Sequence, residues 1–229
     1  MIDHSLTYRK KTIRNIPHIL RLQRILKLLS YLSPNSKESY LDIGCSNGYI
    51  TEIIRNKFNL GASQGMDHTI ENLELARERY PEIRFDFIDL NRPPEDGAIK
   101  YKLITCFETL EHVGHLDNAV SNILSYGSMG SKILISVPIE VGFIGTIKFL
   151  IKTIVFNYSL GELPSQPSWR QYLQALLSGK RISKLRNQRE GWGTHFGFDY
   201  RDVDDILDDS QVKFKALNSF STRFYIINK

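Results

Sequence analysis

Short apolar runs alternate with amphipathic segments through the middle of the chain. Five runs have the length of buried strands, at residues 39–43, 63–67, 84–88, 102–106 and 132–137. Between them, three segments carry apolar side chains at helical spacing, at residues 48–58, 69–79 and 115–126. Strands that alternate with helices in this rhythm predict a parallel sheet with helices on both faces.

The two ends of the chain depart from this alternation. Apolar residues recur at helical spacing through 13–32, with Arg or Lys in the gaps, which predicts a helix that ends before Pro34. Near the other end, 201–209 predicts a helix, and 212–218 and 222–227 predict two strands joined by a very short turn. So short a connection makes the pair antiparallel. The predicted fold class is α/β: a Rossmann-like, doubly wound, mostly parallel seven-stranded sheet that ends in an antiparallel hairpin.

Residues 139–192 interrupt the pattern and predict a helical cap insertion. Within Val141–Phe156, apolar side chains fall on one helical face and two lysines fall on another: Ile144, Ile147, Ile151, Ile154 and Val155 against Lys148 and Lys152. This run is short for a membrane-spanning helix, and it carries charge. We interpret it as a cap or as a membrane-surface helix, with a buried core helix as the alternative.

The bulk composition fits one soluble globular domain. The chain has 229 residues, of which 41% are hydrophobic and 24% charged. Its two cysteines, Cys45 and Cys106, follow no disulfide or zinc pattern, and no signal peptide is recognised, so we expect a cytoplasmic protein, with peripheral membrane contact through the insertion as an addition. We expect a single domain with four parts: an N-terminal helical region (1–38), a binding core (39–138), the cap (139–192) and a C-terminal helix with the hairpin (193–229).

The net charge of +5 is unevenly distributed. Residues 1–27 carry seven Lys or Arg and residues 170–190 carry six, whereas 199–209 carries six Asp. Such runs are usual on solvated faces. The alternative is that the basic segments attract an anionic substrate or a membrane. No recognised nucleic-acid-binding motif accompanies the charge, so we expect no nucleic acid partner.

The segment LDIGCSNG, residues 41–48, lies where the first strand turns into a helix. Gly44 and Gly48 permit a sharp bend and a close approach of a ligand to the backbone. The helix that follows offers free N–H groups and the positive end of its dipole, which suit a carboxylate or a phosphate. Asp42, at the strand end, could pair with a cationic group. By itself, such a loop is a common kind of turn.

Polar groups also follow the next three strands. Asp67 ends the second strand, Asp89 and Leu90 follow the third, and Phe107 and Glu108 follow the fourth. Open α/β sheets bind ligands at this edge, and an acidic group at the second strand end is placed to accept both hydroxyls of a ribose. An adenine edge could meet the acid and the apolar contact after the third strand. Taken singly, each Asp could be only a helix cap or turn residue.

At this point the sequence resembles the class I S-adenosylmethionine-dependent methyltransferases. YLDIGCSNGYI matches their first motif, GMDHTIENLELAR the second, DFIDL the third and LITCFETLEHV the fourth. The resemblance covers about residues 38–138, and the terminal hairpin fits it. Ser46 stands where many members have glycine, and its small side chain should still permit close approach.

The resemblance implies S-adenosylmethionine as cofactor and a role for each motif residue. The methionine part would be surrounded by residues of the first motif, namely Asp42, Gly44, Cys45, Ser46, Gly48 and Tyr49. Asp67 would hold the ribose with His68 beside it, and Asp89 and Leu90 would meet the adenine. Phe107 and Glu108 would line the floor near the sulfonium.

Two segments supply candidate catalytic groups. ETLEHV, residues 108–113, looks like the corresponding segment of the ubiquinone-biosynthesis O-methyltransferases, and its His112 has the basicity of a general base, alongside Glu108. A helix-capping histidine is the alternative. Glu108, Glu111, His112 and His115 have residue types that permit a divalent metal, but nothing fixes their geometry, and we predict none. In GWGTHFGFDYR, residues 191–201, His195 could point into a loop that closes over substrate; an aromatic corner that packs the insertion is the alternative.

The leading hypothesis is methyl transfer from S-adenosylmethionine to a small-molecule or lipid-linked acceptor, most readily at oxygen. A second hypothesis is an NAD(P)-dependent oxidoreductase, although the loop lacks the GxGxxG spacing. A third is a non-catalytic membrane-surface or partner-binding protein that keeps the fold without the reaction.

Overall fold

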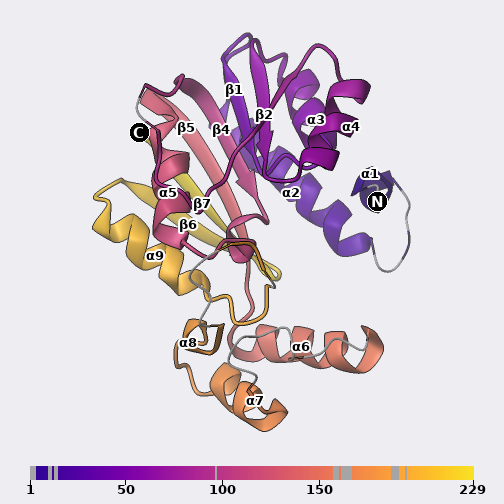
Figure 1. The fold of residues 1–229 in the computed structure, drawn as a ribbon, viewed down its shortest axis with the longest axis vertical. Coiled ribbons are helices and arrows are strands. Elements are labelled where there is room, and N and C mark those ends of the chain that lie inside the picture. The colour runs from indigo at the N-terminus through magenta and orange to yellow at the C-terminus, as the bar shows by residue number, and fades with distance from the viewer. Residues whose placement is uncertain are drawn as a thin grey trace.

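The computed structural model describes residues 4–9, 12, 15–95, 97–156, 160, 167–186, 191–193 and 195–229. Within them, seven strands form one sheet in the order β3-β2-β1-β4-β5-β7-β6 (Figure 1). The strands are β1 (Tyr40–Ile43), β2 (Ser63–Asp67), β3 (Arg84–Phe87), β4 (Tyr101–Phe107), β5 (Gly127–Pro138), β6 (Phe214–Ser219) and β7 (Thr222–Asn228).

The strand directions confirm the predicted fold class. β1 to β5 pair in parallel, and β7 runs antiparallel to both β5 and β6. In register, Ile43 lies between Met66 of β2 and Cys106 of β4, so the loops after these three strands meet at one edge. Only Phe220 and Ser221 separate β6 from β7, and the φ of +52° at Phe220 is the left-handed conformation that such tight hairpin turns use.

Helices cover both faces because alternate strand residues point to opposite sides. On one face, Tyr40, Leu134 and Phe224 pack with the helices α2 (Ile16–Leu32) and α3 (Tyr49–Phe58). On the other face, Ile135 and Tyr225 pack with α5 (Leu116–Ser125) and α9 (Tyr200–Asp209). The helix α4 (Ile70–Arg79) packs against Phe85 of β3 and against Cys45.

Two element boundaries differ from the sequence prediction by three residues or more. β5 begins at Gly127 rather than at residue 132, because GSMGS has no apolar alternation and Met129 is exposed. The N-terminal helix begins at Ile16 rather than at residue 13, with Pro17 in its first turn, where the missing N–H costs nothing. A separate short helix, α1 (His4–Arg9), precedes it and was not predicted.

The described part of the insertion has three helices. It contains α6 (Gly142–Phe156), α7 (Trp169–Leu177) and α8 (Ser183–Arg186), which lie together below the sheet in Figure 1. Its small core includes Phe149 and Tyr172, and Phe196 from the segment after the insertion packs into it. Of the predicted apolar face of α6, Ile144, Ile147 and Ile151 are 40–48% exposed, which contradicts the alternative of a buried core helix at these positions. The side chains of Ile154 and Val155 lie outside the described part of the structure. Across the described ranges, every helix is too short or too polar to span a membrane.

Candidate functional site

The loop between β1 and α3 requires glycine at two points. A Cβ on Gly44 would lie 1.9 Å from the Thr109 Oγ1, and the φ of Gly44 is +79°. Gly48 has a φ of +74°, and a Cβ there would lie 2.7 Å from the Phe85 ring. The backbone therefore bends back on itself and leaves the first N–H groups of α3 facing the edge of the sheet.

Ser46 lies at the tip of this loop. Its φ of +48° is left-handed, a conformation that a glycine would adopt without strain. Its N–H donates to the Asp67 Oδ2 at 2.8 Å, which ties the first loop to the end of β2. Its hydroxyl is buried and makes no hydrogen bond within the described residues. A buried hydroxyl without a partner fits a loop that completes its hydrogen bonds with a polar ligand.

Asp42 supports the loop from inside the fold. Its two carboxylate oxygens accept hydrogen bonds from the hydroxyls of Thr51 and Thr105, at 2.6 and 2.7 Å, and the side chain is buried. Burial raises the pKa of Asp42 to about 6, against the lowering effect of these two hydrogen bonds. The predicted contact of this carboxylate with the methionine part stays a prediction, and its observed role is to hold β1, α3 and β4 together.

Cys45 and Tyr49 occupy the two flanks of the loop. The Cys45 thiol is buried against α4, and burial strongly raises its pKa. The Tyr49 ring stacks on Tyr8 of α1, with ring centroids 5.8 Å apart. The helix α1 thus lies over the start of α3, a contact that the sequence did not indicate.

Asp67, the predicted ribose contact, is held by hydrogen bonds at the end of β2. It is buried, and its oxygens accept hydrogen bonds from the backbone N–H groups of Ser46 and Thr69, at 2.8 and 2.9 Å. Burial opposes ionisation, but hydrogen bonds from His68, Thr69 and Ser46 outweigh it and lower the pKa of Asp67. The carboxylate is therefore ionised at neutral pH, and it keeps lone pairs for ligand hydroxyls.

The two predicted adenine contacts after β3, Asp89 and Leu90, differ in their exposure. The Asp89 carboxylate is partly exposed and accepts hydrogen bonds from the backbone and side chain of Asn91 at 3.1 Å. The pKa of Asp89 is lowered by these bonds, by Arg92 and by a hydrogen bond from the Trp192 side chain, although desolvation opposes this shift. The Leu90 side chain is fully buried in the main core, so only its backbone can meet a ligand.

Trp192 is a site residue that sequence reasoning missed. Its ring stacks on His68 with centroids 3.7 Å apart and planes 9° apart. Gly191 and Gly193, on either side, bond the backbone of Gly114 and His112. The available signal was its place in the dense aromatic and glycine-rich segment 191–201, which was considered as a loop over the site.

At the end of β4, Glu108 is held on both sides. The Ser136 hydroxyl donates to its Oε1 at 3.0 Å, and the Arg21 guanidinium of α2 lies 3.0 Å from its Oε2. Its φ of +50° turns the chain away from the strand. Phe107 beside it packs into the core with α2 and α3, with 9% of its surface exposed. Arg21 could not be predicted, because it comes from a distant helix.

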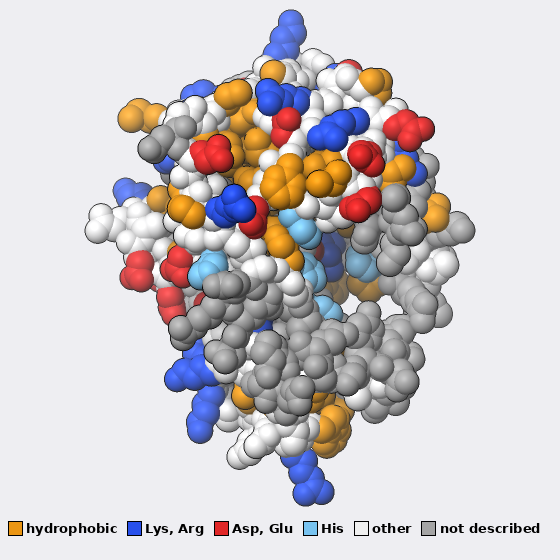
Figure 2. Space-filling view, in the orientation of Figure 1, with side chains coloured by type: hydrophobic (Ala, Val, Ile, Leu, Met, Phe, Trp, Pro, Cys, Tyr) orange, Lys and Arg blue, Asp and Glu red, His pale blue; other side chains and the backbone are white. Residues whose placement is uncertain are grey.

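The structure brings His112 and His195 together. Their ring centroids are 6.2 Å apart. The His112 Nδ1 lies 2.8 Å from the Gly193 carbonyl, which can only accept, so Nδ1 carries the hydrogen and Nε2 keeps its lone pair. Burial lowers the pKa of His112 although Gly193 opposes this. Histidine side chains gather in the hollow at the middle of the face shown in Figure 2.

The metal alternative finds no support in the described part of the chain. There, His, Cys, Asp and Glu side chains nowhere form a group of three or more that could hold a metal ion. Glu111 is buried, and burial together with Glu108 raises its pKa well above the usual range.

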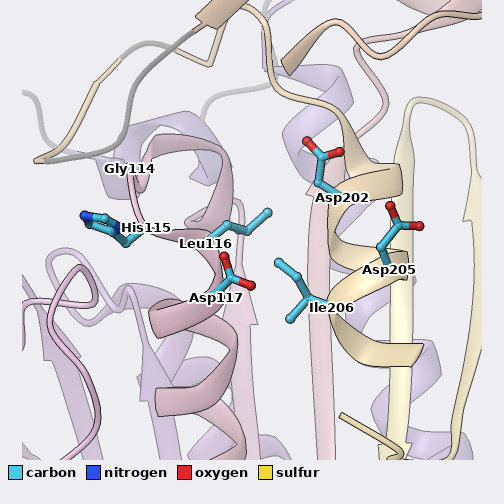
Figure 3. A pocket seen from close by; sticks show the side chains of 7 residues that line it. All are labelled: Gly114, His115, Leu116, Asp117, Asp202, Asp205 and Ile206. Atoms are coloured by element: carbon cyan, nitrogen blue, oxygen red, sulfur yellow. The ribbon is translucent and has the colours of Figure 1, made fainter. Parts of the chain in front are cut away.

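His115 lines a different cavity, of about 440 Å³, between α5 and α9 (Figure 3). That cavity is flanked by Asp202 and Asp205, which already pair with Arg181.

Comparison with known proteins identifies the family of this chain. A family model described as "Methyltransferase domain" matches residues 16–176. The ubiquinone biosynthesis O-methyltransferase of Rickettsia canadensis is 25% identical over 152 residues, which are 63% of this chain and 60% of that protein. The chain spans less than two thirds of the length of the curated relatives that it matches.

Solved structures share the fold at low sequence identity. The magnesium protoporphyrin IX methyltransferase of Synechocystis PCC 6803, solved with bound SAH, has a TM-score of 0.61 and 13% identity, and covers 98% of this chain and 92% of its own. A methyltransferase of Clostridium acetobutylicum has a TM-score of 0.60 and 12% identity, with 90% and 89% covered. On its family match, its strand order and its loop geometry, the chain belongs to the class I S-adenosylmethionine-dependent methyltransferases.

Proposed function

We propose that this chain transfers a methyl group from S-adenosylmethionine to the oxygen of a small or amphipathic acceptor. The observation that carries the choice of oxygen is the orientation of His112. Its Nδ1 is committed to the Gly193 carbonyl, and its Nε2 lone pair is free of that contact. The lowered pKa keeps the imidazole neutral at pH 7, which is the form that accepts a proton.

The residues present fit the cofactor at three positions. The Ser46 hydroxyl and the start of α3 suit the polar methionine part, and the ionised Asp67 suits the ribose hydroxyls. The Asp89 carboxylate suits an amino group on the adenine. The cofactor supplies an activated methyl group on a sulfonium, so the protein has to orient the acceptor, exclude water and remove one proton.

We assign to His112 the role of the base that accepts the proton of the acceptor hydroxyl. As the bond from the acceptor oxygen to the methyl carbon forms and the sulfur–carbon bond breaks, the hydroxyl proton passes to the His112 Nε2. The Arg21–Glu108 pair fixes the end of β4 beside this position. The His195 ring lies beside His112, with its centroid 6.2 Å from that of His112 and 4.8 Å from that of Phe196.

The acceptor is proposed to be amphipathic because α6 offers an apolar surface. Phe143, Ile147 and Ile151 are 75%, 42% and 48% exposed. An aliphatic chain on the acceptor, or a membrane surface that carries it, would cover these side chains. The similarity to a ubiquinone biosynthesis O-methyltransferase supports a hydroxyl on such a molecule.

The test compares His112→Gln with His115→Gln, which alters a histidine of the cavity between α5 and α9. Calorimetry with S-adenosylmethionine and with its demethylated product should give binding in all three proteins, with no competition by NAD(P). With phenolic and lipid-linked hydroxyl acceptors, His112→Gln should lower kcat by about 100-fold or more and abolish the rise of rate with pH, while His115→Gln does neither. Equal rates in the two variants would show that His112 is not the base that accepts the proton.

A second candidate function rests on the same exposed face of α6. If the chain is a membrane-surface or partner-binding protein without catalysis, it should co-sediment with anionic vesicles and transfer no methyl group. Co-sedimentation that depends on Phe143 and Ile147, in a chain that binds no cofactor, would favour this candidate.

A further inference from the structure

The indole of Trp192 contacts two side chains that are assigned to the nucleoside, His68 and Asp89. Its face lies against the His68 ring, with centroids 3.7 Å and planes 9° apart. Its N–H forms a hydrogen bond with the Asp89 carboxylate. The indole is thus a flat, fused bicyclic ring that stacks on His68, next to Asp67, and donates a hydrogen bond to Asp89.

Adenine would make the same set of contacts. It is also a flat bicycle, it would stack beside the ribose-binding Asp67, and its amino group would donate to Asp89. Two stacked rings need about 3.5 Å between their planes, so a third ring between His68 and Trp192 would need about twice that separation. The observed spacing of 3.7 Å leaves no room for it.

The backbone around Trp192 is held in place, so that only the side chain is free to leave. Gly191 O accepts from Gly114 N at 3.0 Å, Gly193 N donates to His112 O at 2.9 Å, and Trp192 itself bridges to Val113. A rotation of the Trp192 side chain about its own bonds is the smallest movement that vacates the position. The Gly193 carbonyl can keep its contact with the His112 ring during that movement.

We propose that the Trp192 indole competes with adenine for this subsite, so that S-adenosylmethionine binds only to the conformation in which the indole has swung out; this rests on the proposed function. The measured affinity then falls by the fraction of molecules in the open conformation. If about one molecule in ten is open, removal of the indole tightens binding about tenfold. The gain is confined to ligands that carry adenine.

The experiment titrates S-adenosylhomocysteine and adenosine into the wild-type chain and into Trp192→Ala and Trp192→Phe by calorimetry. Trp192→Ala should bind both ligands about tenfold more tightly, and Trp192→Phe, which keeps a ring but loses the N–H donor, should lie between. Trp169→Ala is the matched control, since Trp169 is the other tryptophan and lies exposed on α7. Circular dichroism establishes that each variant is folded.

Fluorescence supplies a readout that needs no deletion of Trp192. In Trp169→Phe, Trp192 is the sole tryptophan, and its emission should move to longer wavelength as S-adenosylhomocysteine saturates the chain and the indole enters water. Unchanged emission at saturation, or binding that is equal or weaker in Trp192→Ala, would overturn the inference and leave the proposed function standing. If neither the wild type nor Trp192→Ala binds S-adenosylhomocysteine, the proposed function fails and this inference fails with it.

Discussion

Gly44→Ala tests whether the first loop is fixed by close packing or only by its backbone conformation. The new methyl group would lie 1.9 Å from the Thr109 Oγ1 and 2.8 Å from its Cγ2, so Thr109 has to move. That movement breaks the hydrogen bond from Thr109 Oγ1 to the Phe107 carbonyl, 3.0 Å long and buried. Losing this bond costs about 1 kcal/mol, and forcing a side chain aside in a packed core costs about 1–3 kcal/mol.

Gly130→Ala is the matched control for the cost of placing alanine in a left-handed backbone conformation. Gly130 has nearly the same φ, +76°, but a Cβ there would have nothing within 4 Å. Both variants carry the left-handed strain of roughly 1–2 kcal/mol, offset in part by the reduced freedom of the unfolded chain. The difference between them is therefore the contact with Thr109, about 2–4 kcal/mol.

Urea unfolding measures this difference directly. With a slope of about 2 kcal/mol per molar, Gly44→Ala should unfold about 1–2 M below Gly130→Ala. Adding Thr109→Ala to Gly44→Ala should recover part of the loss, because it removes the two nearest contacts but leaves the Thr109 Cβ at 2.9 Å. Equal midpoints for the two single variants would refute the packing argument.

Two further predictions concern the buried acid and the insertion. The folded pKa of Asp42, about 6, lies above its unfolded value, so the folded state binds more protons between about pH 4 and 6 and stability falls as pH rises through that window. Asp42→Asn should remove roughly 2 kcal/mol of this pH dependence, measured by urea unfolding at pH 4 and at pH 7, and an unchanged dependence would contradict the assignment. The side chain of Ser168 accepts from Gln171 N at 3.3 Å, and the Gln171 side chain accepts from Ser168 N at 2.8 Å, at the start of α7. Ser168→Ala should cost about 1 kcal/mol and speed amide exchange in α7 about fivefold, whereas Ser178→Ala at the other end of the helix should not; equal exchange in the two would mean that the cap contributes nothing.

The sequence was informative where local pattern decides structure. The strand candidates in the sequence match all seven strands. The signal was strongest in β4 and β5, because buried parallel strands need continuous apolar side chains. Asp67 and Asp89 could be placed at the ligand edge because strand ends in a parallel sheet converge. The first five residues of β5, GSMGS, were not predicted as strand because they pair through their backbone and show no apolar alternation.

Contacts between distant segments could not be predicted. Arg21 reaches Glu108 from the second helix, and Trp192 reaches His68 and Asp89 from beyond the insertion. Such pairs depend on how helices cross the sheet edge, which no local pattern encodes. The residues of the metal alternative are also separated in the structure: His115 lines the cavity between α5 and α9, whereas Glu108 pairs with Arg21.

The place of β7 in the sheet has a consequence for synthesis of the chain on the ribosome. β7 lies between β5 and β6 and hydrogen-bonds to both, although it is the last strand to be made. The apolar edge of β5, Ile133 to Val137, therefore stays unpaired while α6 to α9 and β6 emerge. Exposed strand edges of this kind pair readily with other chains, so slow translation beyond Pro138 should favour aggregation, and a helper that shields this edge should raise the yield of folded protein.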